Sequence, residues 1–170
     1  MMNITHKIND NKLSFVIITD THSHLDEQIR NLINKKSYVI HAGDIGDINI
    51  ISDLKSQCKN IFAVNGNNDN YSELLDIEKI ETQYGMIVVE HGDKHGMDYH
   101  ESLRKSHPDA FCIIYGHTHK HIFDMREKPY VINPGASGST RTNGGASCVL
   151  LEIDESGSMS FELKKFDALS

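Results

Sequence analysis

Cysteine and long apolar runs are both scarce in this chain of 170 residues. Its three cysteines lie far apart and form no Cys-x-x-Cys pair, so the sequence argues against a disulfide framework. No apolar run approaches the ~20 residues that span a bilayer, and the first residues lack the long apolar segment of a signal peptide. We therefore expect a cytoplasmic protein without a membrane-spanning segment, in which Cys58, Cys112 and Cys148 are reduced packing residues.

Basic clusters are lacking as well. The chain has 17 Lys and Arg residues against 24 Asp and Glu residues, a net charge of −7, whereas nucleic-acid binders normally present a basic face to the phosphates. The nearest approach to a cluster is the pairs Lys35-Lys36 and Lys164-Lys165, which we interpret as solvated surface residues. The absence of Gly-Lys-Ser or Gly-Lys-Thr excludes a P-loop. Nucleic acid is thus a poor candidate partner.

Length and apolar spacing predict one domain with a β-rich second half. A chain of 170 residues suits a single core, which we place at 13–170 after a polar, loosely held lead-in at 1–12. Apolar runs separated by turn residues predict two pairs of adjacent strands, at 79–89 and at 148–163. Helical spacing predicts three helices outside two packed sheets: one through Leu25–Ile33, one over Asp98–Lys105, and one capped by Asp47 that buries Ile48, Ile51 and Leu54.

Two histidines follow a predicted strand in the segment Gly116-His117-Thr118-His119. The apolar run at 111–115 predicts a buried strand that ends there. A loop at a strand end can direct both imidazoles into one site, and neutral imidazole is the commonest metal-binding side chain. On its own the motif is weak, because a His-x-His segment on a loop is usually polar surface.

Four further polar segments each follow a predicted strand. These strands are predicted at 13–18, 38–40, 60–64 and 86–89. In open α/β sheets ligands bind at the carboxyl ends of the strands, so carboxylate, imidazole and amide groups at five such ends indicate one shared site. The segments are Asp20-Thr21-His22, Gly43-Asp44, Gly66-Asn67-Asn68-Asp69 and His91-Gly92.

Together these segments supply seven nitrogen or oxygen donors. Seven exceeds the four of a tetrahedral zinc site, and mixed nitrogen and oxygen ligation suits manganese, iron, nickel or zinc. If one carboxylate bridges, seven donors serve two ions about 3.5–4 Å apart, an arrangement used for in-line displacement at phosphorus. The donors are Asp20, His22, Asp44, Asn67, His91, His117 and His119.

The order of these five motifs resembles the calcineurin-like metallophosphoesterases, and within them the small, single-domain phosphodiesterase branch. The likeness runs from about Ser14 to the C-terminus and includes Ile132–Ser137, which is similar to an Asn-Pro-Gly-Ser loop of that branch. It implies an α/β fold, a four-layer α/β/β/α sandwich of two packed mixed β-sheets with ligands at the strand ends. It also implies a first ion held by Asp20, His22, Asp44 and His119, and a second held by Asp44, Asn67, His91 and His117.

The activity implied by the resemblance is that of a phosphodiesterase with two divalent metal ions, for which we favour Mn²⁺ over Ni²⁺, Zn²⁺ or Fe²⁺. A hydroxide that bridges the ions would attack a small phosphodiester in line. A homo-oligomer is also compatible with the sequence. The residues expected in catalysis are Asp44, Asn67, Asn68 and His91, and those expected to contact substrate are Asn68, His24 and Arg141.

Asn68 departs from the family pattern, which has His at this position in the wider superfamily and often Cys in the small branch. An amide has no usable pKa near neutrality, so Asn68 can donate a hydrogen bond to a leaving oxygen but cannot protonate it. Two alternatives stay open: a non-catalytic protein-binding scaffold of this fold, as in a subunit of eukaryotic retromer, and a nuclease of the superfamily.

Other polar residues near the motifs each have two interpretations. His41 either packs in the core or orients a ligand, and Asp69 either orients a ligand or caps a turn. The segment from Asn133 to Ser137 forms either a simple turn or a phosphate-facing loop. Four further histidines are expected at the surface: His6, His95, His100 and His107.

Overall fold

Two mixed β-sheets form the centre of the molecule. This computed structural model describes residues 5–138 and 145–167. The six-stranded sheet has the order β1 (Thr5–Ile8), β5 (Ile77–Thr82), β6 (Gly85–Glu90), β7 (Cys112–Ile114), β9 (Tyr130–Pro134) and β8 (His121–Asp124). The five-stranded sheet has the order β11 (Met159–Phe166), β10 (Ala146–Ile153), β2 (Leu13–Ile18), β3 (Tyr38–His41) and β4 (Asn60–Ala63).

Strand β2 is buried on both faces, which explains its nearly unbroken apolar sequence. Leu13, Phe15 and Ile17 join the core between the two sheets, while Val16 and Ile18 belong to the core under the helices. Strands β2, β3 and β4 pair in parallel, so each connection must cross over. These crossovers carry α1 (Glu27–Arg30) and α2 (Asn49–Gln57). The carboxyl ends of these three strands therefore lie together at one end of the five-stranded sheet.

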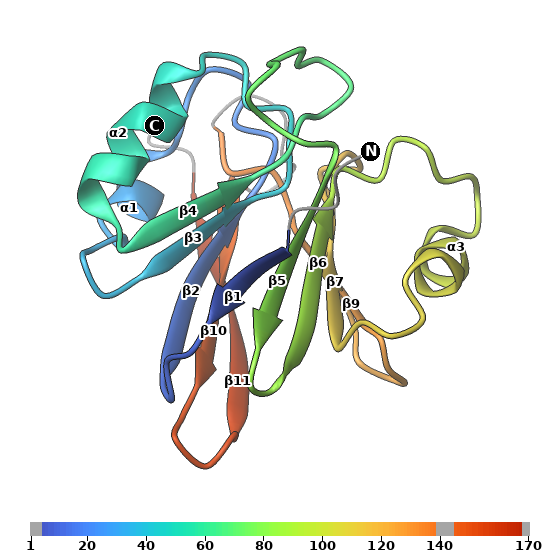
Figure 1. Ribbon diagram of the computed structural model, residues 1–170. Coiled ribbons are helices and arrows are strands. Elements are labelled where there is room, and N and C mark those ends of the chain that lie inside the picture. Colours follow the sequence, from blue (N-terminus) through green and yellow to red (C-terminus); the bar gives the residue numbers. More distant parts are fainter. Residues whose placement is uncertain (1–4, 139–144, 168–170) are drawn as a thin grey trace.

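Helices lie on the outer face of each sheet (Figure 1). α1 and α2 pack on the five-stranded sheet through Ile29, Ile50 and Leu54, and α3 (Tyr99–Ser106) packs on the six-stranded sheet through Leu103. The order helix, sheet, sheet, helix confirms the predicted four-layer fold with two mixed sheets. Within the described ranges, no helix is long and apolar enough to cross a membrane.

The prediction that residues 1–12 are loosely held is wrong in part, because Thr5–Ile8 form β1. This strand pairs in parallel with β5 at the edge of the six-stranded sheet, and Ile8 is buried between the sheets. The sequence signal was weak, since three of the four residues of this strand are polar.

The helices occur where the sequence places them, but with different bounds. The first has a single turn, and Asp26 caps it by accepting hydrogen bonds from the backbone N–H groups of Gln28 and Ile29. The second begins at Asn49, two residues after the predicted cap Asp47. It buries Ile50 and Leu54, whereas Ile48 and Ile51 are only half-buried.

The remaining strands include two predicted hairpins and two strands that differ from the prediction. The hairpins β5–β6 and β10–β11 confirm the two predicted strand pairs. The edge strand β8 was not predicted, and residues 132–134, which the sequence assigned to a loop, belong to β9. The three cysteines are free and buried, as expected of packing residues.

Candidate metal centre

The seven predicted donors meet at one end of the sandwich, where the strand ends of both sheets come together. Each donor lies in a loop that follows a strand, so the buried strands fix where each loop begins. The five-stranded sheet supplies Asp20, His22, Asp44 and Asn67, and the six-stranded sheet supplies His91, His117 and His119.

The backbone of these loops is strained. Within residues 5–138 and 145–167, six non-glycine residues have positive φ, and all six lie in loops that carry donors. Such left-handed backbone costs on the order of 1–3 kcal/mol for each residue and gathers at functional sites. Five of the six are themselves predicted donors; the set is Asp20 (51°), His22 (44°), Ser23 (73°), Asp44 (53°), His117 (66°) and His119 (57°).

One cluster contains Asp20, His22 and His119. The Nε2 atoms of the two histidines lie 3.3 Å apart, and Asp20 Oδ1 lies 3.3 Å from His119 Nε2. The other oxygen, Asp20 Oδ2, accepts hydrogen bonds of 3.0 Å from the Thr19 hydroxyl and the His117 backbone N–H. Asp20 Oδ1 is buried and accepts no hydrogen bond from the described residues. One carboxylate oxygen therefore faces the two imidazoles.

A second cluster contains Asn67, His91 and His117. Asn67 Oδ1 lies 3.1 Å from His91 Nε2 and 3.1 Å from His117 Nδ1. The His91 ring is oriented from behind, because its Nδ1 lies 2.8 Å from the carbonyl oxygen of Ala42 and donates to it. This hydrogen bond directs Nε2 toward the cluster, as second partners of metal-binding histidines commonly do.

Asp44 lies between the two clusters. Its Oδ1 is 3.4 Å from His91 Nε2 in one cluster, and its Oδ2 is 3.7 Å from His22 Nε2 in the other. Asn68 holds the carboxylate with two hydrogen bonds, from its backbone N–H to Oδ1 at 3.0 Å and from its side-chain amide to Oδ2 at 2.7 Å. The two oxygens face different clusters, an orientation that allows the carboxylate to bridge two ions.

The electrostatics around Asp44 favour its ionised form. Burial would raise the pKa of Asp44, but hydrogen bonds from His91 and Asn68 outweigh it and hold that pKa well below the usual range. Burial likewise opposes protonation of His91, yet its hydrogen bond with Asp44 and the nearby charge of Asp20 raise the pKa of His91. A cation that binds His91 therefore competes with a proton for the imidazole nitrogen.

His41 connects the loops that follow β2 and β3 through hydrogen bonds to residues of both loops. Its Nδ1 accepts a 3.3 Å hydrogen bond from the Gly43 backbone N–H, so its Nε2 donates to the Thr21 hydroxyl at 2.9 Å. That hydroxyl in turn donates to the carbonyl oxygen of Ile45 at 2.9 Å. Burial lowers the pKa of His41 to about 4, so the ring is neutral at pH 7. The orienting interpretation is the one that these contacts support.

Asp69 also braces the loop that carries Asp44. Its carboxylate accepts hydrogen bonds from the backbone N–H groups of Ile45, Gly46 and Gly66. This carboxylate thereby ties the loop after β4 to the loop after β3, which holds Asp44 and Asn67 in a fixed relation.

Close packing at two glycines keeps the loops together. A Cβ atom on Gly66 would lie 2.2 Å from Asp44 Oδ1, and one on Gly116 would lie 2.0 Å from Thr19 Oγ1. Contacts this short do not occur with real Cβ atoms, so both positions require glycine for space.

The three predicted substrate contacts have different outcomes. Asn68 lies in the site, but its amide donates to Asp44, and a contact with substrate stays a prediction. His24 is exposed beside the Asp20 loop, and its backbone N–H donates to the carbonyl oxygen of Thr21. Arg141 lies outside the described residues.

The segment from Asn133 to Ser137 holds two of the loops of the site through hydrogen bonds. Asn133 and Ser137 are fully buried. The Asn133 amide donates to the carbonyl oxygen of Gly116 at 2.7 Å, and the Ser137 hydroxyl donates to Ser147 O while accepting from the Thr19 backbone N–H. Their side chains thus hold the loops after β7 and β2, and this packing role was missed in the sequence.

The prediction that His95 and His107 lie at the surface is wrong. Their side chains are only 8% and 10% exposed, because both hydrogen-bond to the buried carboxylate of Glu90, at 3.1 Å and 2.8 Å. His100 is half-buried and contacts Asp124 at 2.9 Å. Buried acidic partners account for all three, and those of His100 and His107 lie on distant segments that no local sequence pattern indicates.

The donor set fits a divalent cation of the transition series. Two groups of residues each bring their carboxylate and imidazole atoms within 4.8 Å of one another. The first group is Asp20, His22 and His119, and the second is Asp20, Asp44 and His91. The buried Asp20 Oδ1, which accepts no hydrogen bond from the described residues, is the kind of atom that a cation satisfies. Nitrogen and oxygen donors without thiolate suit manganese, iron, nickel or zinc. The residues therefore fit the metal that the sequence predicted.

Comparison with known proteins decides the family. Residues 13–156 match the model of the calcineurin-like phosphoesterase superfamily domain. The chain belongs to this superfamily. A phosphodiesterase of Methanocaldococcus jannaschii is 33% identical over 137 residues, which cover 70% of this chain and 81% of that protein. Membership confirms the resemblance inferred from the five motifs.

Solved structures of the same fold include a Vps29 protein and a bacterial protein. A crystal structure of Entamoeba histolytica Vps29 complexed with zinc has a TM-score of 0.74 and 20% identity, covering 91% of this chain and all of that one. A solution structure of a Thermotoga maritima protein has a TM-score of 0.69 and 27% identity, covering 91% and 99% of the two chains. The Vps29 likeness is one of fold alone.

Proposed function

We propose that this protein is a phosphodiesterase that depends on two divalent metal ions and hydrolyses a small phosphodiester. The observation that carries the proposal is the position of Asp44, whose two carboxylate oxygens face the two donor clusters. The superfamily assignment and a phosphodiesterase relative support the same class of reaction. We favour manganese, with nickel, zinc or iron as alternatives, because the donors combine four imidazoles with carboxylate and amide oxygens.

Each cluster would hold one ion in this proposal. The first ion would bind Asp20, His22, Asp44 and His119, and the second would bind Asp44, Asn67, His91 and His117. Divalent ions in such pairs supply Lewis-acid chemistry, since they lower the pKa of water and withdraw charge from phosphoryl oxygens.

The residues of the chain set the charge and geometry of that site. Two carboxylates against two divalent ions leave a positive site, which suits an anionic phosphoester. Asn68 fixes Asp44 through two hydrogen bonds, and Ala42 fixes the ring of His91. Asn68 cannot donate a proton to a leaving oxygen, so diesters with acidic leaving groups should be the better substrates.

Exchanging Asp44 for asparagine tests the proposal. The purified protein is analysed for bound metal and assayed against phosphomonoesters and phosphodiesters with manganese added. Asp44→Asn should abolish hydrolysis and reduce bound metal with the fold retained, because the change is nearly isosteric. Asp53→Asn on the exposed side of α2 makes the same exchange away from the site and should keep wild-type activity.

A protein-binding scaffold is the alternative that the fold comparison favours. Structures of Vps29 have TM-scores near those of the other matches, for example 0.75 for the Cryptosporidium parvum protein at 18% identity. If the wild-type protein shows no metal-dependent hydrolysis of any phosphoester, the scaffold is the better assignment. A nuclease is disfavoured because the net charge of −7 opposes association with a long polyanion. The proposed setting is the cytoplasm, in keeping with three free cysteines.

A further inference from the structure

A cavity of about 580 Å³ lies at the end of the five-stranded sheet opposite the candidate metal centre. Its walls come from the start of β2, the turn before β3, the residue before β4 and the end of β10. The predicted metal donors instead follow the carboxyl ends of β2, β3 and β4. Strand β2 has 6 residues, which at ~3.3 Å per residue separate the two places by roughly 20 Å. The cavity is therefore a separate feature.

The lining of this cavity is basic although the chain is acidic. Four lysines and two carboxylates line it, whereas the whole chain has a net charge of −7. An anion is therefore attracted to this part of the surface more than to the surface as a whole. The charged lining residues are Lys12, Lys35, Lys36, Lys59, Asp10 and Glu152.

Both carboxylates in the cavity already have partners. Asp10 forms an ion pair with Lys59 and accepts a 2.8 Å hydrogen bond from the Tyr38 hydroxyl. Glu152 accepts a 2.6 Å hydrogen bond from the Ser14 hydroxyl. Within the described residues, Lys59 is the one lysine of this cavity that forms an ion pair. Lys12 and Lys36 form no ion pair with the described residues, and four lysines against two carboxylates give the lining a net positive charge.

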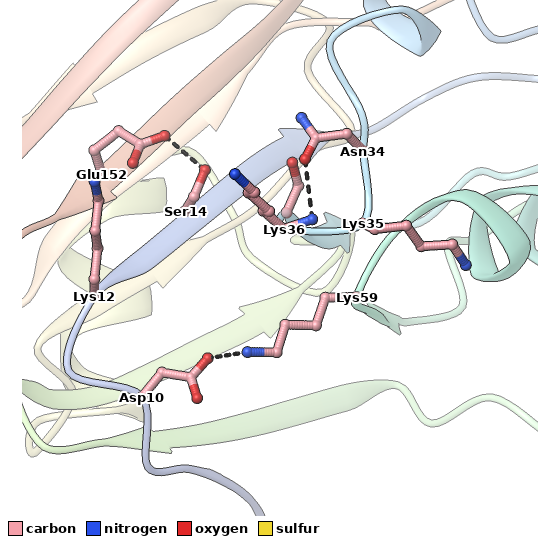
Figure 2. Close-up of a pocket in the computed structure, with 9 residues that line it drawn as sticks. Asp10, Lys12, Ser14, Asn34, Lys35, Lys36, Lys59 and Glu152 are labelled. Atoms are coloured by element: carbon pink, nitrogen blue, oxygen red, sulfur yellow. Dashed lines mark hydrogen bonds and ion pairs between the residues drawn. The ribbon is translucent and has the colours of Figure 1, made fainter.

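The turn that carries Lys36 is fixed by its own hydrogen bonds. The Lys36 backbone N–H donates to the Asn34 side chain at 3.0 Å, and the backbone N–H of the buried Ser37 donates to the carbonyl oxygen of Asn34 at 2.9 Å. Figure 2 shows Lys12, Lys36 and Lys59 around the cavity and Lys35 pointing away from them. Because the backbone of this turn is already fixed, a ligand that binds here needs to order only the lysine side chains.

We propose that this cavity binds an oligophosphate, either free or as the phosphate chain of a nucleotide. The volume of about 580 Å³ falls in the range of about 300–1,000 Å³ that small-molecule sites occupy. The charged lining does not suit an apolar ligand, and lysine binds phosphate as a point charge. A ligand with several negative charges matches lysines that approach the cavity from three segments of the chain.

Calorimetric titration with inorganic tripolyphosphate and with ATP tests this site. Both ligands are titrated into the wild-type protein and into Asp44→Asn, because a phosphate chain can also reach the candidate metal centre. Saturable binding that persists in Asp44→Asn and weakens as salt shortens the Debye length supports the cavity. Equal affinity for both ligands identifies the phosphate chain as the recognised part, and tighter binding of ATP identifies a nucleotide.

Charge reversal locates the binding. Lys12→Glu with Lys36→Glu should weaken binding by about tenfold or more, whereas Lys105→Glu on α3 makes the same kind of change on the other sheet and should leave it unchanged. If the double variant fails to fold by circular dichroism, Lys36→Gln takes its place, with a smaller loss expected. Absence of saturable binding, equal affinity in the double variant, or tighter binding of polyglutamate than of tripolyphosphate would overturn the proposal.

Discussion

Replacing Gly116 with alanine tests whether close packing of the loop after β7 holds the site together. The new Cβ atom would lie 2.0 Å from Thr19 Oγ1 and 2.8 Å from Asp20 Oδ2, whereas ordinary contacts begin at 3.4 Å. The loop or Thr19 must therefore move by about 1.4 Å. Movement of the loop disturbs its neighbours, because the Gly116 N–H donates to His91 O at 3.0 Å and its carbonyl oxygen accepts from Asn133 at 2.7 Å.

The size of the effect follows from this displacement. Overpacking of a closely packed region costs about 1–3 kcal/mol, and for a chain of this size each kcal/mol lowers Tm by about 2–4 °C. Gly116→Ala should therefore lower Tm by about 2–12 °C. A shift of about 1 Å in positioning groups can also cost about 10²-fold in rate, so bound metal and any hydrolysis should fall together.

Scanning calorimetry and elemental analysis measure the two effects. Gly96→Ala is the matched control, because a Cβ atom there meets nothing within 4 Å. Adding Thr19→Ala to Gly116→Ala removes the nearest atom and should recover part of the lost stability, which a double-mutant cycle quantifies. A Gly116→Ala protein with wild-type Tm and wild-type metal content would refute the packing explanation.

Three further outcomes are expected. Chelation should remove metal and activity reversibly, and acidification should release metal because protons compete for His22, His91, His117 and His119; activity without detectable metal in excess chelator contradicts this. Asn68→His should raise hydrolysis of substrates with alkyl leaving groups most, by up to roughly 10²–10⁴-fold, and equal wild-type rates for phenolic and alkyl leaving groups, with chemistry limiting, argue against the role given to Asn68. Hydrogen bonds from Arg126, Arg104 and His100 hold the pKa of Asp124 far below its usual range, so Asp124→Asn should destabilise the protein by about 1.5–3 kcal/mol at neutral pH. That difference is fully present above the unfolded-state pKa of about 3.9 and disappears as pH falls toward the folded-state value, so denaturation at several pH values checks its sign.

The sequence predicted that the seven candidate donors lie together, because the position of each depends on local information. A buried strand such as β2 gives a short apolar run, and Asp20 and His22 follow it directly. Parallel pairing then brings the ends of such strands to one edge, a consequence of topology that needs no knowledge of side-chain packing.

Features that depend on distant partners were not predictable in this way. Strand β1 exists because β5 offers an edge, and its sequence Thr5–Ile8 is mostly polar. His95 and His107 are buried because Glu90 lies between them. Asn68 contacts Asp44, 24 residues away. For β1, His107 and Asn68 the deciding partner lies on a distant segment, so local patterning carries no signal for it.

The division of the donors between the two sheets has a mechanical consequence. Each cluster combines residues of the five-stranded sheet with residues of the six-stranded sheet, Asp20 and His22 with His119, and Asn67 with His91 and His117. An ion bound at either cluster would cross-link the two sheets at one end of their shared core, much as a disulfide staples two segments. Loading with metal should therefore slow amide hydrogen exchange in both sheets together, and its loss should loosen the seam between them.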